Sequence, residues 1–174
     1  MTDTTAASPA PLACAGLPRR LGALLYELLL LVAIVFVAGF LALPLISPSR
    51  SRSVDALTVP ALPERVALFC LLFAIAAWYF VWSWTGGRRT LPMKTWRLRL
   101  VLANGRPLPA KVALLRYLAA WIGPALALAA YAALHRYGLG AHALWLIAFN
   151  FLWALVDPDR QFLHDRIAGT RIVT

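Results

Sequence analysis

The sequence predicts an all-α membrane protein with four transmembrane helices and a small β-element at the cytoplasmic surface. Hydrophobic residues make up 61% of the 174-residue chain, well above the about 45–50% of soluble domains. Apolar runs of membrane length recur along the chain. Lysines and arginines, which give a net charge of +10, gather beside these runs. Cytoplasmic loops of membrane proteins carry their positive charge in this way, so we expect no nucleic-acid partner.

The apolar runs define the domain organisation. Residues 1–18 are rich in Ala, Pro, Ser and Thr without periodicity, which predicts a disordered tail. Residues 19–174 are expected to form a single transmembrane domain. Its helices are predicted at about 21–45, 66–84, 112–134 and 141–156. The fourth run is at the short end of the about 17–25 residues that cross a bilayer, and a short glycine-containing link makes the last two helices an antiparallel hairpin.

Positive charges set the expected orientation. Arg19 and Arg20 precede the first helix, and three arginines follow the fourth. The loop between the second and third helices is the richest, with Arg88, Arg89, Lys94, Arg97, Arg99, Arg106 and Lys111. The loops on the other side carry fewer basic residues. The positive-inside rule then places both termini in the cytoplasm, where anionic lipid headgroups are the expected partner of the basic residues.

The central loop carries a strand pattern. Large apolar and basic residues alternate over 96–103, and Asn104-Gly105 follows as a hairpin-turn signal. Pro107 and Pro109 limit the return strand to a stub. We expect a small cytoplasmic β-hairpin with a C-terminal strand over 170–173 along its edge. An amphipathic ribbon with its leucines in the membrane interface is the alternative.

Polar residues inside the apolar runs are the candidate functional residues. Glu27 lies within the first run, where a carboxylate costs about 2.5–3.5 kcal/mol to insert, and Arg20 stands at the mouth of that run. Arg116 and Asn150 lie at a similar depth in the third and fourth helices. We expect Glu27, Arg116 and Asn150 to meet in the bundle. Three interpretations stay open: a proton or cation site at Glu27, a helix-locking Glu27–Arg116 pair with Asn150 as a further interhelical contact, or a role in binding a partner.

His164 and Asp165 follow the fourth helix. A structural role is expected, with Asp165 paired to Arg166 or to a central-loop arginine such as Arg89. The alternative is a proton shuttle, because a histidine beside a carboxylate titrates near neutral pH.

Metal and enzyme chemistry are not expected. Cys14 and Cys70 are too scattered for a metal site, and His135 and His142 are predicted on the opposite side of the membrane from His164. No glycine-flanked serine suggests a nucleophile. The sequence therefore predicts no metal, no other cofactor and no enzymatic activity.

Four motifs complete the sequence evidence: Arg20-Leu21-Gly22-Ala23 followed by Tyr26-Glu27, the stretch Gly87–Lys94, the segment Trp96–Val101 with Asn104–Leu108, and Leu163–Thr170. Together they resemble the RDD family of small bacterial integral membrane proteins. That family is named for an Arg at the start of its first helix, an Asp within that helix and a further Asp, here matched by Arg20, Glu27 and Asp165. Glu27 replaces the usual Asp, and Pro92 stands where Gly is usual.

The resemblance implies a multi-pass protein of the bacterial inner membrane. The family is thought to include transporters, and cation/proton antiport has been attributed to a member. We therefore expect transport of a small ion or solute, with cation/proton exchange as its most concrete form. The alternative is a non-catalytic scaffold or accessory subunit that binds another membrane protein. Because four helices make a thin pathway, a homo-oligomer or a membrane-protein partner is also expected.

Overall fold

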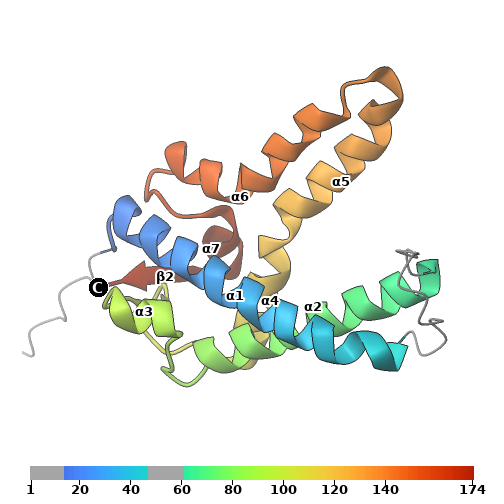
Figure 1. Cartoon of the computed structure of the whole chain (residues 1–174). Coiled ribbons are helices and arrows are strands. Elements are labelled where there is room, and N and C mark those ends of the chain that lie inside the picture. The colour runs from blue at the N-terminus through green and yellow to red at the C-terminus, as the bar shows by residue number, and fades with distance from the viewer. Residues whose placement is uncertain (1–13, 47–60) are drawn as a thin grey trace, which may run out of the picture.

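The computed structural model describes residues 14–46 and 61–174. Most of these residues are helical, and the elements run in the order α1 (Leu17–Ile46), α2 (Leu62–Trp84), α3 (Leu91–Thr95), β1 (Arg99–Leu102), α4 (Ala110–Ala120), α5 (Ile122–Leu134), the 3₁₀ helices η1 (His135–Tyr137) and η2 (Gly140–Ala148), α6 (Phe149–Leu152), η3 (Trp153–Leu155), α7 (Leu163–Ala168) and β2 (Thr170–Val173). Figure 1 shows two arms, α1 with α2 and α5 with η2, that diverge from one end of the molecule.

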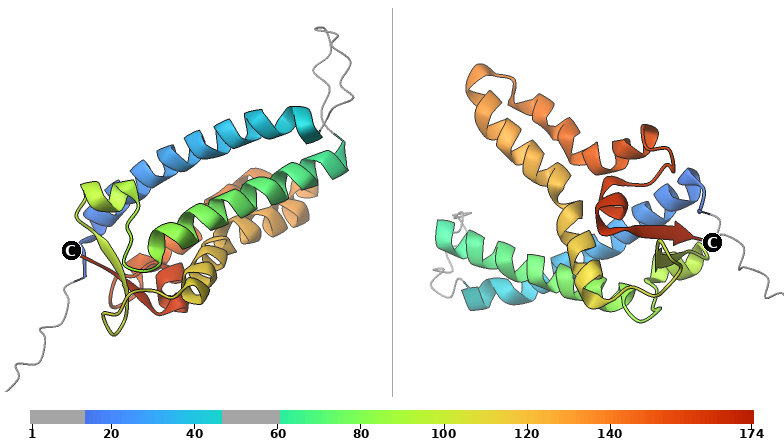
Figure 2. Two further views of the ribbon diagram at one scale, coloured as in Figure 1. Left: turned by 90° about the horizontal axis from the view of Figure 1, so that it is seen from below. Right: turned by 180° about the vertical axis from the view of Figure 1, so that it is seen from behind.

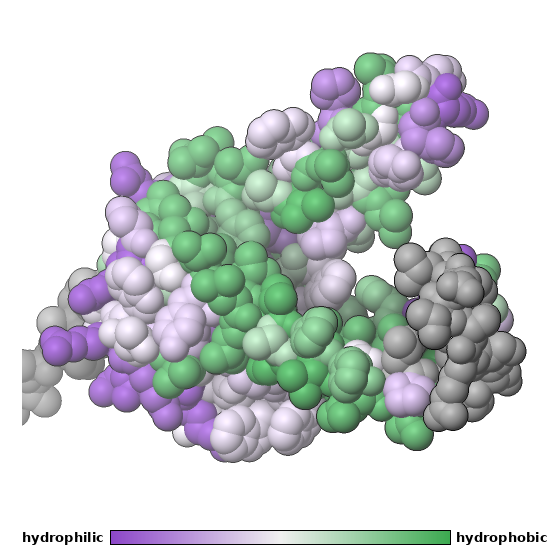
Figure 3. Space-filling view, viewed as in Figure 1, coloured by the Kyte–Doolittle hydropathy of each residue, from purple (hydrophilic) through white to green (hydrophobic). Residues whose placement is uncertain are grey.

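Within the described residues, three helices are long and apolar enough to cross a membrane: Leu17–Ile46, Leu62–Trp84 and the near-continuous run Ala110–Tyr137. Their outer faces carry large exposed side chains, such as Phe36 and Phe40 of α1. Apolar residues cover much of this surface in Figure 3. Lipid rather than water suits such a surface, so the expected helical membrane fold and the first three predicted helices are confirmed.

The fourth apolar run, Gly140–Leu155, is shorter than the other three and mostly 3₁₀-helical. A 3₁₀ helix rises about 2.0 Å per residue against about 1.5 Å in an α-helix, so this geometry lengthens a short segment. The run packs back along α5 as the predicted antiparallel hairpin (Figures 1 and 2). Gly138, with φ of +75°, makes the reversal.

Small residues in α5 bring this hairpin close together. A Cβ atom on Gly123 would lie 2.6 Å from the carbonyl oxygen of Ile147, which leaves room for glycine alone. Gly123 and Ala127 are both buried within the protomer.

The small sheet differs from the predicted hairpin. The Asn104-Gly105 turn forms, with Gly105 at φ of +80° and the Leu102 N–H donating to the Arg106 carbonyl over 2.9 Å. The chain then leaves the sheet, because Pro107 and Pro109 cannot donate to β1. β1 pairs with the C-terminal β2, which confirms the predicted strand over 170–173; the pairing is antiparallel, from Arg99 opposite Val173 to Leu102 opposite Thr170.

Cys14 and Ala15, where the described residues begin, join this sheet, which corrects part of the predicted tail. Cys14 forms an isolated antiparallel bridge with Val173, and the Ala15 N–H donates to the Ile172 carbonyl over 2.9 Å. The rest of the predicted tail, residues 1–13, lies outside the described residues. Both ends of the described chain therefore lie at the sheet end of the molecule, and the helices run outward and back twice between them (Figure 2).

The buried core sits at the same end. It joins the first turns of α1, the end of α2, the central loop, α4 and β2, and its members include Ala23, Trp84, Met93, Leu98, Leu100, Leu108, Ala113, Tyr117 and Ile172. This core fixes the side chains from which the candidate site is built.

Candidate functional site

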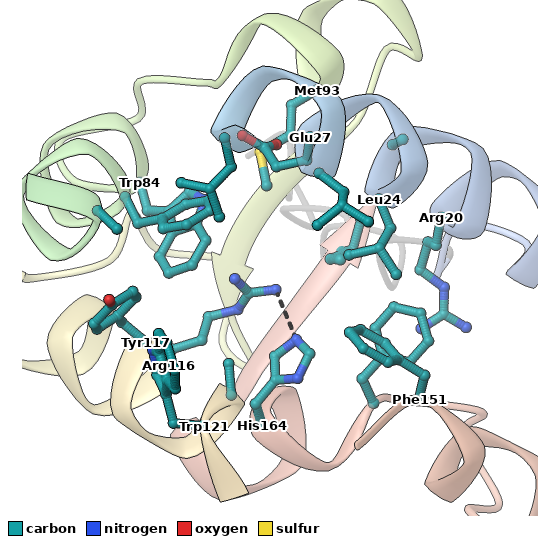
Figure 4. A pocket seen from close by; sticks show the side chains of 18 of the residues that line it. Arg20, Leu24, Glu27, Trp84, Met93, Arg116, Tyr117, Trp121, Phe151 and His164 are labelled. Carbon is teal, nitrogen blue, oxygen red and sulfur yellow. Dashed lines mark hydrogen bonds between the residues drawn. The ribbon is translucent and has the colours of Figure 1, made fainter. Parts of the chain in front are cut away.

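A cavity of about 360 Å³ opens where the two arms diverge. α1, α2, α4 and α5 form most of its wall, and the region around α7 closes it. The lining is largely apolar, but Arg20, Glu27, Arg116 and His164 also reach it (Figure 4). Four of the six residues singled out in the sequence thus share one cavity, although they do not all touch one another.

Arg116 and Asp165 form a buried ion pair behind this wall. The Arg116 Nε lies 2.7 Å from the Asp165 Oδ1, and the two residues are 5% and 1% exposed. The Thr170 hydroxyl donates to the same carboxylate oxygen over 3.1 Å. The Arg116 guanidinium also lies 4.2 Å from the ring centre of Trp84. Arg116, rather than the expected Arg166 or Arg89, is therefore the partner of Asp165.

Burial and charge act in opposite directions on Asp165. Burial alone raises the pKa of a carboxyl, but the Arg116 charge and the hydrogen bonds to the ionised form outweigh it, so the pKa of Asp165 is lowered. Asp165 is held ionised, and α7 is tied to α4 by this charge.

His164 is held neutral beside the pair. Burial lowers the pKa of His164 from 6.5 to about 4, the nearby Asp165 opposes this shift, and Arg116 adds to it. The Arg116 Nη2 lies 3.3 Å from the His164 Nε2. Because a guanidinium only donates, Nε2 accepts, which assigns the proton of the neutral ring to Nδ1.

Glu27 has partners that the sequence did not indicate. Its Oε1 accepts a hydrogen bond from the Tyr79 hydroxyl over 2.9 Å, and its Oε2 accepts one from the Thr90 hydroxyl over 2.7 Å. No Lys, Arg or His among the described residues forms an ion pair with it. The expected direct contact of Glu27 with Arg116 or Asn150 is therefore wrong, although Arg116 lines the same cavity.

The two partners differ in how visible they are in the sequence. Thr90 precedes Leu91-Pro92 and caps α3, accepting a hydrogen bond from the Met93 N–H over 3.3 Å. A threonine directly before a proline-initiated helix is a capping signal that marks this position. Tyr79 carries no such signal, because one tyrosine in an apolar helix is indistinguishable from its lipid-facing neighbours.

Arg20 lies at the rim of the cavity and is 4% exposed. Its Nη2 donates to the Arg160 carbonyl, and its guanidinium carbon lies 5.1 Å from the ring centre of Phe162. Its buried Nε has no hydrogen-bond partner among the described residues. No carboxylate of the described residues pairs with it.

Asn150 lies away from the other candidates. Its Nδ2 donates to the carbonyls of Ala120, over 2.7 Å, and Ala119, over 3.3 Å. The helix breaks between α4 and α5 at Trp121, which leaves carbonyls of the last α4 turn without helical partners. Asn150 binds these carbonyls and so connects α6 to the end of α4, which is an interhelical contact.

The ion pair leads to a prediction about stability. Replacing Asp165 by Leu or Arg116 by Met should each lower the free energy of unfolding by about 3–5 kcal/mol, because either change leaves one buried charge alone. The double variant should lose less than the sum of the two. Unfolding in detergent micelles with a double-mutant cycle measures this.

Asp159→Asn is the control for this cycle. It breaks an exposed pair, Asp159–Arg166, whose side chains are 44% and 49% exposed, and should cost about 0–1 kcal/mol. An Asp165→Leu variant as stable as Asp159→Asn contradicts the importance of the buried pair.

The neutral histidine predicts a pH dependence. Unfolded His164 binds a proton near pH 6.5, whereas the folded residue does so only near pH 4. The unfolded state therefore holds more protons in this window, and the melting temperature should fall as the pH drops from 6.5 toward 4.

The wild type and His164→Asn are compared in detergent across this window. The variant should show a weaker decline, while the exposed His142→Asn should follow the wild type. Identical profiles for wild type and His164→Asn contradict the assignment.

Comparison with known proteins completes the site. Among the described residues, no group of three His, Cys, Asp or Glu side chains is placed to hold a metal ion. Neither a search of curated proteins nor a search of solved structures finds a match. The profile of the RDD family matches residues 14–169. This match covers most of the chain and includes every candidate residue from Arg20 to Asp165, so the chain belongs to the RDD family.

Proposed function

We propose that this membrane protein exchanges a small monovalent cation for protons, with Glu27 as the group that binds either one. The observation that carries this proposal is the setting of Glu27: a carboxylate in a membrane-length helix, beside a cavity, without an ion-pair partner among the described residues. A carboxylate in this position is costly and marks a functional site by default.

The oxygens around Glu27 support cation binding. The Tyr79 and Thr90 hydroxyls lie 2.9 and 2.7 Å from its carboxylate oxygens, so four oxygen atoms gather at one point. Carboxylate and hydroxyl oxygens suit hard cations. Both hydroxyls are neutral and do not balance the negative charge of Glu27. A proton or a cation that binds and leaves can balance it instead. Asp165, by contrast, has a fixed guanidinium partner.

We also propose that the protein crosses the bacterial inner membrane four times, with both termini in the cytoplasm. The pairing of Cys14 with Val173 at the sheet end supports an even number of crossings. The central loop with its basic residues lies at that end, whereas Arg136 lies at the far turn between α5 and η2. This asymmetry agrees with the positive-inside rule. In this arrangement the run Gly140–Leu155 is the fourth crossing.

Reconstituted liposomes with a pH-sensitive dye inside test the exchange. Gradients of Na⁺, K⁺ or Li⁺ should drive proton flux through the wild type, and Glu27→Gln should abolish that flux because it cannot release a proton. Tyr79→Phe and Thr90→Val should raise the cation concentration needed for half-maximal flux.

Glu64→Gln is the matched control and should keep full flux, because the Glu64 carboxylate binds the Ala61 N–H at the start of α2. Absence of flux from folded wild type contradicts cation/proton exchange and favours an accessory subunit that binds another membrane protein. Undiminished flux through Glu27→Gln contradicts the role of Glu27.

Cysteine labelling in spheroplasts tests the topology. The native Cys14 is exposed, so it is assayed in a Cys70→Ala background. Single cysteines at exposed positions, Arg136→Cys and Thr174→Cys, are assayed with both native cysteines replaced. A membrane-impermeant maleimide should label Arg136→Cys in intact spheroplasts, and Cys14 and Thr174→Cys only after permeabilisation. Labelling of Thr174→Cys in intact spheroplasts contradicts a fourth crossing.

A further inference from the structure

We propose that the cavity binds one anionic phospholipid from the surrounding membrane, with the lipid phosphate at Arg20 and part of an acyl chain along the apolar wall. The lipid would share this cavity with Glu27, but its binding through Arg20 does not depend on the proposed exchange at Glu27.

Arg20 is the group that calls for an anion. Arg20 is 4% exposed, its guanidinium has a carbonyl and an aromatic ring as neighbours, and its Nε has no partner among the described residues. Buried charges are normally paired, and the described residues offer Arg20 no carboxylate. The planar fork of a guanidinium binds phosphate oxygens in pairs, so a phosphate supplies both the missing charge and the missing acceptor.

The other charged groups of the cavity have partners, whereas the neutral Trp84 Nε1 and His164 Nδ1 have none among the described residues. Arg116 binds Asp165 and His164, and Glu27 binds two hydroxyls. The remaining lining is apolar and includes Leu24, Leu28, Leu31, Phe80, Pro124 and Phe151. A sugar or a nucleotide would find few hydrogen-bond partners in this apolar lining. An amphiphile with one charged end matches a cavity with the Arg20 cation at one end and apolar side chains along the rest.

The polar and apolar ends of the cavity are arranged like the headgroup and the acyl chains of a membrane lipid. Its α1 wall runs from Arg20 to Leu31, which at about 1.5 Å per residue is about 16 Å along the helix. Arg20 is in the first turn of this membrane-length helix, at the depth where headgroups lie, and Leu31 points to the hydrocarbon end. A bound lipid would therefore keep the orientation that it has in the bilayer.

The size and the opening fit a lipid held in part. A volume of about 360 Å³ is near the lower end of the about 300–1,000 Å³ of ligand sites, enough for a chain segment but not a whole phospholipid. The space-filling view shows a notch between the two apolar arms with hydrophilic residues at its base (Figure 3). The rest of the lipid can remain in the bilayer between the arms.

Native mass spectrometry of delipidated protein in neutral detergent tests the site. The probes are dioleoyl phosphatidylglycerol, dioleoylglycerol with the same chains but no phosphate, and inorganic phosphate. The wild type should retain one phosphatidylglycerol, with an apparent affinity about tenfold or more above that for dioleoylglycerol. Inorganic phosphate should bind far more weakly than the lipid. Phosphate that binds as tightly as the lipid overturns the proposal in favour of a free anion.

Two matched pairs of variants locate the headgroup and the chain. Arg20→Gln should lose the preference for phosphatidylglycerol and Arg20→Lys should keep part of it, while the exposed neighbour Arg19→Gln should behave as wild type. Leu24→Trp fills the cavity and should lose retention of both lipids. Leu25→Trp, at a side chain that is 62% exposed on the outer face, should not.

Opposite outcomes overturn the proposal. A phosphatidylglycerol preference that survives in Arg20→Gln, or an equal loss in Arg19→Gln, removes Arg20 as the headgroup ligand. Retention by Leu24→Trp equal to that by Leu25→Trp places the lipid outside the cavity. If Arg20→Gln does not fold, the comparison of the three probes on wild type and on Arg20→Lys decides.

Discussion

The buried ion pair between Arg116 and Asp165 is the interaction on which the rest of the structure depends. It joins α4, in a membrane-length run, to the short α7 that follows the last hairpin, across 49 positions of the chain. α7 leads directly into β2, and β2 then pairs with β1 on one side and Cys14 on the other. The ion pair therefore helps to hold the C-terminal segment, which lies between β1 and Cys14, against α4. Removing one partner leaves the other charge unpaired in an apolar core.

The same constraint explains the other polar side chains. In an apolar environment each donor or acceptor needs a partner, and some of the partners come from the ends and breaks of the helices. Asn150 binds carbonyls that the α4–α5 break sets free, and Glu27 binds the hydroxyl that caps α3. Arg20 has such a partner on only part of its guanidinium. Several buried polar atoms of the described residues lack a partner, and among them Arg20 Nε belongs to a cation without a carboxylate partner.

The two acidic motif residues illustrate how surroundings divide their roles. Asp165 is fixed in its ionised form by a guanidinium and a hydroxyl. Among the described residues, Glu27 accepts hydrogen bonds from two hydroxyls and forms no ion pair. The first arrangement favours a structural role and the second an exchangeable one, and both lie around one cavity at the junction of the two arms.

The sequence by itself determined the class of the protein. Apolar runs of about 20 residues can only be satisfied as helices in a membrane, which is why α1, α2 and the α4–α5 run were predictable. The alternation before Asn104 likewise predicted β1. The C-terminal strand over 170–173 beside β1 was also predicted, and the structure confirms it. Tertiary structure alone decided the side-chain partners, such as Tyr79, which lies 52 positions from Glu27 and donates a hydrogen bond to it. Local patterns encode periodicity and cost of burial, whereas pairing depends on the packing of distant segments, which no local pattern contains.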